Sequence, residues 1–301
     1  MASVLIFGPT GQVGSVAAAT ATSLNAKVTL AMRDTSKPIP SLPDSSNYAK
    51  VQADLTDPTS VANAVKASGA TRAFVYLAQR DPASMRAVAQ ALKDAGITFV
   101  VFLSSQTIPH DKALKEVEAE NFIPYLHAQY EAALDDVFGE ENYVAIRPGA
   151  FVSNFRTEID GVAAGKVSLV GADFKMDSVI PADIGRVAGS VLVEGPKNGQ
   201  KKVYVYGPQI LSMEDSLKRI GSVLGREIEV QNVPAESVDK SKVPPPVKYR
   251  LDRLAEEREG KGWKERFWKY EEGVKNVELY TGKPATTLEE WVAENKAIFG
   301  A

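Results

Sequence analysis

The 301-residue sequence has no cysteine, only two histidines and no long apolar run. Without cysteine, the chain has no disulfide, no thiol nucleophile and no cysteine-ligated metal. The histidines, His110 and His127, do not form the short spacing of a zinc-binding motif. We therefore expect no metal site.

Signals for export and for membrane insertion are also missing. No apolar segment approaches the length of about 18 residues that a membrane-spanning helix needs, so no membrane contact is expected. The N-terminus lacks the charged segment that precedes the apolar part of a secretory signal, and its apolar run is broken at Gly8 and Pro9. These absences favour a cytoplasmic protein.

The overall charge and composition exclude other classes of protein. A net charge of −3 does not favour direct nucleic-acid binding through a broad basic surface. With 44% hydrophobic and 24% charged residues, the composition is typical of a soluble globular protein. We expect a monomer or homodimer whose partner is a small-molecule substrate.

The first residues contain the most informative motif in the chain. An apolar run at 4–7 is followed by Gly8, Gly11 and Gly14, and then by an alanine-rich segment at 15–24. This pattern predicts a strand, a tight turn and a helix. Gly8 permits a sharp exit from the strand, Gly11 leaves room for a pyrophosphate, and Gly14 lets the helix lie close to the sheet.

The context of this motif favours a nucleotide site over an ordinary strand–helix turn. The spacing is G-x-x-G-x-x-G, whereas many dehydrogenases have G-x-G-x-x-G. Free backbone N–H groups at the start of a helix attract phosphates. We therefore expect Thr10, Gln12 and Val13 to contribute to cofactor binding together with the three glycines.

Strands and helices alternate over about the first 150 residues, which predicts a Rossmann-type, doubly wound parallel sheet of the α/β class. The expected strands are 4–7, 27–33, 48–53, 71–77, 97–103 and 142–147. The expected helices are 15–24, 58–68, 82–95 and 112–138, the last interrupted near Pro124. Asp57 is the expected N-cap of the second of these helices.

The second half is less regular and predicts a smaller α+β substrate-binding part. We expect a cofactor domain at 1–150 and a substrate domain at 151–301, with some later elements packing back on the first. The expected elements are helices at 180–194 and 212–224, strands at 201–206 and 228–233, and helical segments at 251–261, 263–280 and 287–299. A capping box of Thr287 and Glu290 begins the last segment.

Arg33 indicates which cofactor is bound. In dinucleotide-binding folds, an acidic residue after the second strand holds the ribose 2′-hydroxyl. Here Arg33 stands at that position and Lys37 adds a second positive charge, so the charges favour the 2′-phosphate of NADP(H). Asp34 complicates this interpretation, since it either binds a ribose or serves as a turn residue.

Further cofactor contacts are expected where other strands end, because ligands bind at the carboxyl edge of such sheets. Asp54 either hydrogen-bonds the adenine amino group or solvates the start of the next helix. The predicted cofactor contacts at these strand ends are Asp54, Leu55, Ala78, Gln79 and Ser104, and Ser105 and Gln106 are predicted to line the substrate pocket.

Several motifs, taken in order along the chain, resemble the NmrA-like group of atypical short-chain dehydrogenases/reductases. They are G-P-T-G-Q-V-G at 8–14, Met-Arg-Asp at 32–34, Ala-Asp-Leu-Thr-Asp at 53–57, R-P-G-A-F-V-S-N-F at 147–155 and P-A-D-I-G-R at 181–186. The segment around His127 and the ending at 294–296 are most similar to the fungal festuclavine/agroclavine dehydrogenases. The resemblance implies NADP(H) binding and a role in secondary metabolism.

The chain departs from the wider family at the catalytic position. Reductases of that family use a tyrosine that lies four residues before a lysine. The tyrosine is the proton donor, and the lysine lowers the pKa of the tyrosine. Alignment on the family's Lys-x-x-x-Glu pattern places His127 at the lysine and Ile123 at the tyrosine. Tyr125 lies roughly opposite on the helix. The usual acid is therefore absent.

This absence limits the chemistry that we expect. Reduction of a plain ketone leaves an alkoxide that needs a proton or an oxyanion site, whereas reduction of an iminium ion gives a neutral amine directly. We therefore expect an NADP(H)-dependent reductase of an activated C=N or C=C bond. The alternatives are a non-catalytic NADP(H) redox sensor and a repurposed reductase that catalyses a cyclisation or isomerisation.

Candidate residues for the catalytic and substrate sites follow from the same resemblance. His127 is expected to hold the nicotinamide ribose or donate a proton, and its alternative role is packing against the sheet. Asn154 is the second catalytic candidate. The substrate pocket is predicted to include His110, Phe151 and Phe155, although an exposed loop position for the histidine and core packing for the phenylalanines are open alternatives.

A last aromatic cluster has two possible roles. Trp263, Phe267, Trp268 and Tyr270 lie close together in the sequence, with Trp263 and Phe267 on one helical face. They form either the core of the smaller domain or a lid over the substrate.

Overall fold

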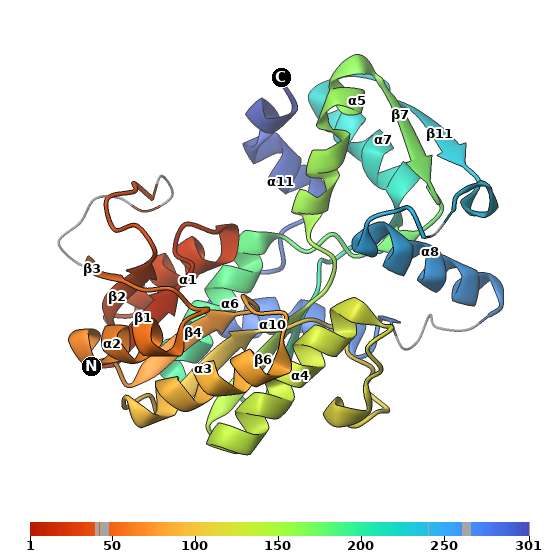
Figure 1. Ribbon diagram of the computed structural model, residues 1–301. Helices are drawn as coiled ribbons and strands as arrows, with labels where there is room; N and C mark the ends of the chain where they lie inside the picture. The colour runs from red at the N-terminus through yellow and green to blue at the C-terminus, as the bar shows by residue number, and fades with distance from the viewer. Residues whose placement is uncertain (40–41, 43–47, 240, 261–265, 301) are drawn as a thin grey trace.

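The computed structural model describes residues 1–39, 42, 48–239, 241–260 and 266–300. The chain forms two lobes (Figure 1). The larger lobe surrounds a seven-stranded sheet, and the smaller lobe contains two short two-stranded sheets and several helices. No helix among the described residues is both long enough and apolar enough to cross a bilayer.

The large sheet is parallel throughout, with the strand order β3-β2-β1-β4-β5-β6-β9. Its strands are β1 (Ser3–Phe7), β2 (Lys27–Met32), β3 (Tyr48–Gln52), β4 (Arg72–Tyr76), β5 (Phe99–Leu103), β6 (Tyr143–Pro148) and β9 (Lys202–Val205). The order of the first six strands is that of dinucleotide-binding folds, with the switch point between β1 and β4. The predicted Rossmann-type fold is confirmed.

Helices cover both faces of this sheet (Figure 1). One face packs against α1 (Gln12–Ser23), α6 (Pro181–Glu194) and α10 (Tyr270–Thr281). The other packs against α2 (Pro58–Ser68), α3 (Pro82–Asp94) and α4 (Phe122–Phe138). Because both faces are covered, central strands such as β5 are almost continuously apolar.

Two glycines allow α6 to lie close against α1. A Cβ atom on Gly185 would lie 2.6 Å from the Cβ of Val16, and one on Gly189 would lie 2.7 Å from the Cβ of Thr20. The missing side chains thus let the backbones approach each other. This contact packs α1, the helix that follows the glycine-rich turn, against α6 on the same face of the large sheet.

The smaller lobe has its own buried apolar core. Its regular elements are α5 (Ile159–Ala164), β7 (Lys166–Val170), β8 (Lys175–Met176), β10 (Leu211–Ser212), α7 (Met213–Leu224), β11 (Glu229–Val233), α8 (Pro245–Arg258) and α11 (Leu288–Glu294). Short 3₁₀ turns lie at Val152–Glu158, Ala235–Ser237 and Lys296–Phe299, and a further one at Leu114–Glu116 packs beside α4 of the larger lobe. Strands β7 and β11 pair in parallel, and β8 and β10 pair antiparallel.

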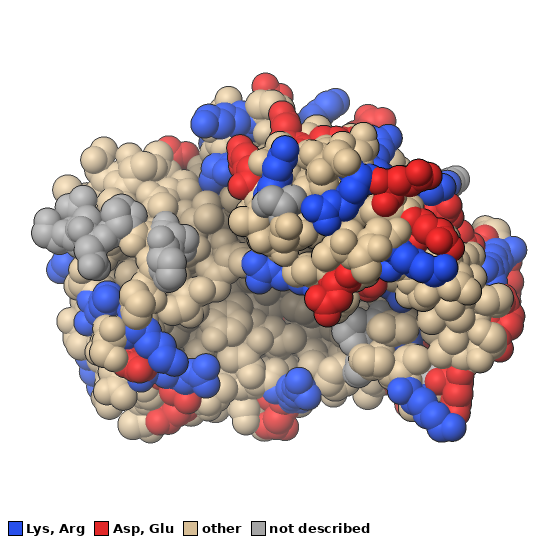
Figure 2. Space-filling model, turned by 90° about the horizontal axis from the view of Figure 1, so that it is seen from above, with Lys and Arg blue, Asp and Glu red and all other residues tan. Residues whose placement is uncertain are grey.

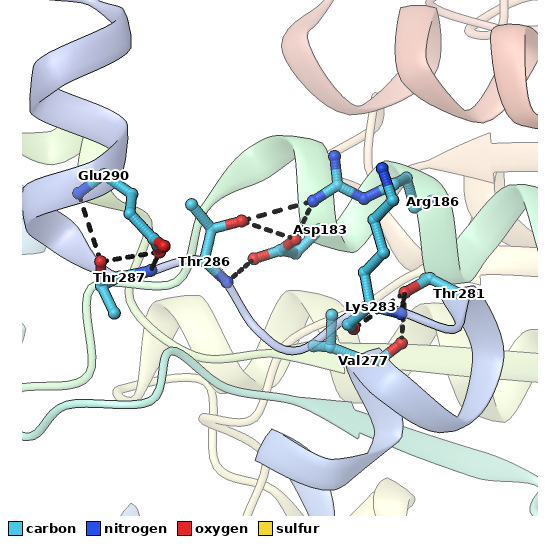
Figure 3. A network of polar contacts seen from close by, with 8 residues as sticks. All are labelled: Asp183, Arg186, Val277, Thr281, Lys283, Thr286, Thr287 and Glu290. Carbon is cyan, nitrogen blue, oxygen red and sulfur yellow. Dashed lines mark hydrogen bonds and ion pairs between the residues drawn. The ribbon is translucent and has the colours of Figure 1, made fainter.

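A buried carboxylate joins the C-terminal segment to α6 (Figure 3). Asp183 accepts hydrogen bonds from the backbone N–H of Thr286 at 2.9 Å and from its hydroxyl at 3.1 Å, and it pairs with Arg186. The next residues form the predicted capping box, in which Thr287 accepts from the N–H of Glu290 and the Glu290 carboxylate accepts from the N–H of Thr287. This network lies where the chain passes from α10 to the smaller lobe.

Some expected element boundaries were wrong. Residues 112–121 contain only a 3₁₀ turn, so the predicted helix 112–138 begins at Phe122, with Pro124 in the first turn where it has no N–H to satisfy. Helix α8 begins inside the triple proline rather than after it. The first residues of the predicted helix 263–280 lie outside the described residues, and within the described part α10 begins at Tyr270. Asp57 is the expected N-cap.

The division into domains at residue 150 stays a prediction. Elements from beyond this position contribute α6, β9 and α10 to the large lobe, as anticipated for some of them. The first segment after β6 enters the core of the smaller lobe, where Val152 is fully buried.

Candidate functional site

The glycine-rich turn between β1 and α1 is closed by its own backbone. Gly8 has a φ of +68°, in the left-handed region that favours glycine. Its carbonyl accepts a hydrogen bond from the N–H of Gly11 at 3.0 Å. A Cβ atom on Gly14 would lie 2.2 Å from the same carbonyl oxygen, so only glycine fits there.

The open end of this turn can receive an anion. Gly11 is the N-cap of α1 and offers no side chain to the first N–H groups of the helix. Thr10 and Gln12 are exposed beside them, whereas Val13 is buried in the core and can contribute only its backbone. The N-terminus of a helix with uncapped N–H groups favours a phosphate.

Tyr76 adds an aromatic wall that the sequence analysis missed. It ends β4, and a Cβ atom on Gly8 would lie 2.7 Å from its ring. The ring is therefore packed directly over the turn. The only sequence signal for this role is its position at the carboxyl end of a strand beside the switch point.

The residues predicted to select the cofactor lie at the ends of β2 and β3. Arg33 and Lys37 are exposed. Hydrogen bonds from the hydroxyl and N–H of Ser36 lower the pKa of Asp34, which supports its interpretation as a turn residue. Asp54 likewise accepts from the N–H and hydroxyl of Thr56, and the nearby Arg33 contributes to lowering its pKa.

Leu55, which follows β3, and Gln79, which follows β4, are more deeply buried than Arg33 and Lys37. Leu55 is 4% exposed, and its carbonyl accepts a hydrogen bond from the side-chain amide of Gln79. The amide oxygen of Gln79 is buried with no partner among the described residues. Ala78 packs partly against the core. The orphaned amide oxygen can accept a hydrogen bond from a ligand without rearrangement.

A cleft of about 730 Å³ lies at the carboxyl edge of β4, β5 and β6, and the smaller lobe forms its other side. Seen from above, the molecule is hollowed between the lobes, with a mainly uncharged floor (Figure 2). The predicted residues that line the cleft are Ser104, Ser105, Gln106, His127, Phe151 and Asn154. This edge is where open α/β sheets bind their ligands.

His127 lies in this cleft as a neutral imidazole. Burial lowers its pKa to about 4, with Glu131 opposing the shift and Arg147 adding to it. Its Nδ1 atom is buried with no partner among the described residues. Ile123 also lines the cleft one turn earlier, whereas Tyr125 packs toward the core. The histidine therefore does not replace the charge of a lysine at neutral pH.

The depressed pKa of His127 predicts acid sensitivity. Between pH 6.5 and pH 4 the unfolded chain binds a proton at this residue and the folded protein does not, so stability falls as the pH falls. Relative to His127→Gln, the protein should lose up to about 3 kcal/mol over this range. Urea unfolding at several pH values measures the difference. Equal slopes for the two proteins would contradict the buried, neutral state.

A buried ion pair lies directly behind His127 and was missed by the sequence analysis. Arg147 donates to both oxygens of Glu131, at 3.0 and 2.7 Å, and Ser104 donates its hydroxyl to the same carboxylate. Glu131 and Arg147 are 0% and 2% exposed. Burial opposes the charge on Arg147, but Glu131 outweighs it and raises the pKa of the guanidinium. Ser104 is thus held by Glu131 while it lines the cleft.

Asp177 forms a second buried carboxylate at the cleft. It accepts hydrogen bonds from the N–H groups of Ala150 at 2.8 Å and Gly207 at 3.0 Å, and so ties together the ends of β6 and β9. Burial raises its pKa to about 6 despite these donors. A Cβ atom on Gly149 would lie 2.1 Å from this carboxylate, which explains the glycine.

The remaining candidates for the substrate pocket and the aromatic cluster lie in different places. Phe155 is 1% exposed in the core of the smaller lobe, so packing is its role there. His110 lies outside the cleft and stacks on Trp268 with ring centroids 3.8 Å apart, beside a second cavity of about 490 Å³. Phe267 lines the main cleft, and the hydroxyl of Tyr270 donates to the carbonyl of Gly207. The fourth aromatic residue, Trp263, lies outside the described residues.

The family follows from comparison with known proteins. A model of the NmrA-like family matches residues 1–292. The chain belongs to the NmrA-like family. It is 36% identical to the nitrogen metabolite regulation-like protein bik4 of Gibberella fujikuroi, over 96% of this chain and 95% of that protein. The resemblance inferred from the sequence motifs is confirmed.

Two other relatives are named as enzymes. The chain is 29% identical to the (4-alkanoyl-5-oxo-2,5-dihydrofuran-3-yl)methyl phosphate reductase of Streptomyces griseus, over 75% of this chain and 76% of the enzyme. It is also 29% identical to festuclavine dehydrogenase easG of Aspergillus fumigatus, over 46% of this chain and 49% of that protein. The relatives of this chain thus include a reductase and a dehydrogenase as well as a protein named for regulation.

Solved structures show the same fold. The NADPH-dependent quinone oxidoreductase QOR2 of Escherichia coli, complexed with NADPH, matches with a TM-score of 0.69 and 19% identity, over 97% of this chain and 99% of that one. The lobes and the sheet edge therefore have counterparts in a structure that contains a dinucleotide.

Proposed function

We propose that this NmrA-like protein is an NADP(H)-dependent reductase of a small metabolite with an activated C=N or C=C bond. The observation that carries the proposal is the cleft that begins at the carboxyl edge of the sheet and contains neutral His127, with Ile123 in place of an acid. Similarity to a named reductase and to a named dehydrogenase supports it.

The residues at the sheet edge fit a dinucleotide. The glycine-rich turn offers uncapped N–H groups to a pyrophosphate, and a Cβ atom on Gly14 would fill the turn. Buried, unpartnered polar atoms of Gln79, Gln106 and His127 can bond to the ribose and nicotinamide groups. When bound, the reduced cofactor supplies a hydride.

The chain's own residues orient and shield the reaction. Tyr76, Phe151 and Phe267 give the cleft apolar walls that exclude water. His127, uncharged at neutral pH, can hold a ribose hydroxyl or a substrate atom but is a poor source of a proton. An iminium ion needs no proton after hydride addition, and a conjugated C=C bond delays protonation to a later step. Such substrates match this cleft better than a plain ketone.

Arg33 is expected to select NADPH over NADH. Replacement by serine removes charge-assisted hydrogen bonds to the 2′-phosphate, which should raise the Kd for NADPH about 10- to 100-fold. Arg33→Lys should keep part of the affinity because it retains the charge but not the planar fork. Fluorescence titration with NADPH and NADH measures both constants. Equal losses for NADPH and NADH would contradict this role.

Turnover tests the reductase proposal. Purified protein is mixed with NADPH and a panel of cyclic iminium ions, conjugated enones and plain ketones, and absorbance at the nicotinamide band is followed. We expect oxidation with members of the first two classes and little with ketones. Asn154→Ala should reduce the rate while NADPH binding and the unfolding midpoint remain near those of the unmodified protein. His127→Ala should reduce the rate and also weaken NADPH binding, because the buried imidazole is expected to bond to the nicotinamide ribose.

A non-catalytic NADP(H) sensor is the second candidate. Two observations favour it. One is the similarity to a protein named for nitrogen metabolite regulation, and the other is that neither Ile123 nor neutral His127 is an effective proton donor. A sensor should bind NADPH and NADP⁺ with clearly different affinities and oxidise NADPH with no member of the panel. The two titrations and the turnover assay together separate the candidates.

A further inference from the structure

We infer that Arg250 binds an anionic group, a carboxylate or a phosphate, on the molecule that enters the cleft. This inference deepens the proposed function, on which the identity of that molecule as a substrate rests. Arg250 lies on α8 in the smaller lobe and lines the cleft, which His127 lines from α4 of the larger lobe. The two residues thus contact the cleft from different lobes.

The guanidinium of Arg250 has no carboxylate partner among the described residues. Its Nη1 atom contacts the sulfur of Met213 at 3.0 Å, and its Nε atom is buried without a hydrogen-bond partner. A thioether is a weak acceptor, so most of the donor capacity of this group is unused. Burial lowers the pKa of Arg250, with Glu158 as the opposing charge, which indicates an environment where a counter-ion is favourable.

Other charges that line the cleft do not compensate for Arg250. Asp177 already accepts N–H groups from two strand ends, and Arg266 pairs with Glu257 at 2.6 Å. Lys175 adds an exposed positive charge to the same lining. The cationic side chains of the lining are Lys175, Arg250 and Arg266, and its carboxylate is Asp177.

The apolar side chains of the cleft indicate the chemical character of the rest of the ligand. Phe151, Met176, Met213, Val247 and Phe267 lie in the same lining as Arg250. A flat, unsaturated body against these side chains, with an acidic group on the guanidinium, satisfies both features. Arginine holds carboxylates and phosphates in a bidentate manner, so one side chain can orient the ligand as well as attract it.

Matched ligand pairs test the inference without requiring turnover. The probes are 1-naphthoate with 1-naphthamide, and 1-naphthyl phosphate with 1-naphthol, titrated by calorimetry with and without NADP⁺. We expect at least one anion to bind about tenfold or more tightly than its neutral partner, and the two pairs show whether carboxylate or phosphate is preferred. Arg250→Gln should abolish the preference and Arg250→Lys should keep part of it.

Lys248→Gln is the matched control, since Lys248 lies on the same helix, pairs with Asp252 at 2.9 Å and does not line the cleft. This variant should bind the probes like the unmodified protein. The inference is overturned if neither anion binds more tightly than its neutral partner, or if Arg250→Gln keeps the preference. A preference for anions without any NADPH oxidation would leave the inference standing and reject only the proposed reductase activity.

Discussion

Glu131→Gln should destabilise the protein by about 3–5 kcal/mol, because it leaves the charge of Arg147 buried without a partner. Both side chains are almost fully buried, and the carboxylate holds the guanidinium through two hydrogen bonds. The remaining contact of Arg147, with the hydroxyl of Tyr204 at 3.3 Å, does not compensate for the lost charge. Urea unfolding at pH 7 measures the loss.

The double variant Glu131→Gln/Arg147→Met separates the pair from its surroundings. It should lose clearly less than the sum of the two single variants, because no charge remains buried. A loss below about 1 kcal/mol for Glu131→Gln would show that the pair is solvated rather than buried.

Substitutions in the glycine-rich turn should have the largest effect on cofactor binding. Alanine at Gly11 is compatible with the backbone, where φ is −84° and ψ is 162°, and its Cβ atom would lie 3.3 Å from the carbonyl oxygen of Gly8. The fold should therefore survive, but the methyl group occupies the approach of the pyrophosphate. We expect the Kd for NADPH to rise about 100-fold or more, as measured by fluorescence titration.

Gly14→Ala and Gly189→Ala separate binding from stability. The Cβ atom of the first would lie 2.2 Å from the backbone oxygen of Gly8, so the turn must open and both binding and stability should be lost. That of the second would lie 2.7 Å from the side chain of Thr20, farther along α1 from the turn. It should lower the unfolding midpoint but leave NADPH affinity almost unchanged in the folded protein. Normal NADPH binding by Gly11→Ala would contradict the assignment of the turn.

The sequence predicted the cofactor half of the molecule well because its signals are local. The turn at Gly8, the strand ends and the cap at Asp57 depend on residues only a few positions apart. Their conformations therefore follow from backbone sterics and from apolar periodicity. The expected helix 112–138 was too long because a helical pattern alone did not locate its start at Phe122.

The side-chain contacts around the cleft could not be predicted because they join distant segments. Arg250 meets Met213 across 37 positions, and Arg147 meets Glu131 from a strand that packs under α4. A charged residue in an apolar helix, such as Glu131, indicates that a partner exists, but the sequence does not say which. His110 likewise stacks on Trp268, a contact that no local pattern indicates.

Transfer of deuterium from NADPH that carries deuterium at both C4 positions tests the central claim most directly, because either of these atoms can leave as the hydride. The protein is incubated with the labelled cofactor and the panel of iminium ions and enones, and the products are analysed by mass spectrometry. The proposed function predicts one deuterium on the former C=N or C=C carbon of at least one product, lost in the Gly11→Ala variant. Tight NADPH binding with no deuterium in any product would contradict a reductase and leave the sensor.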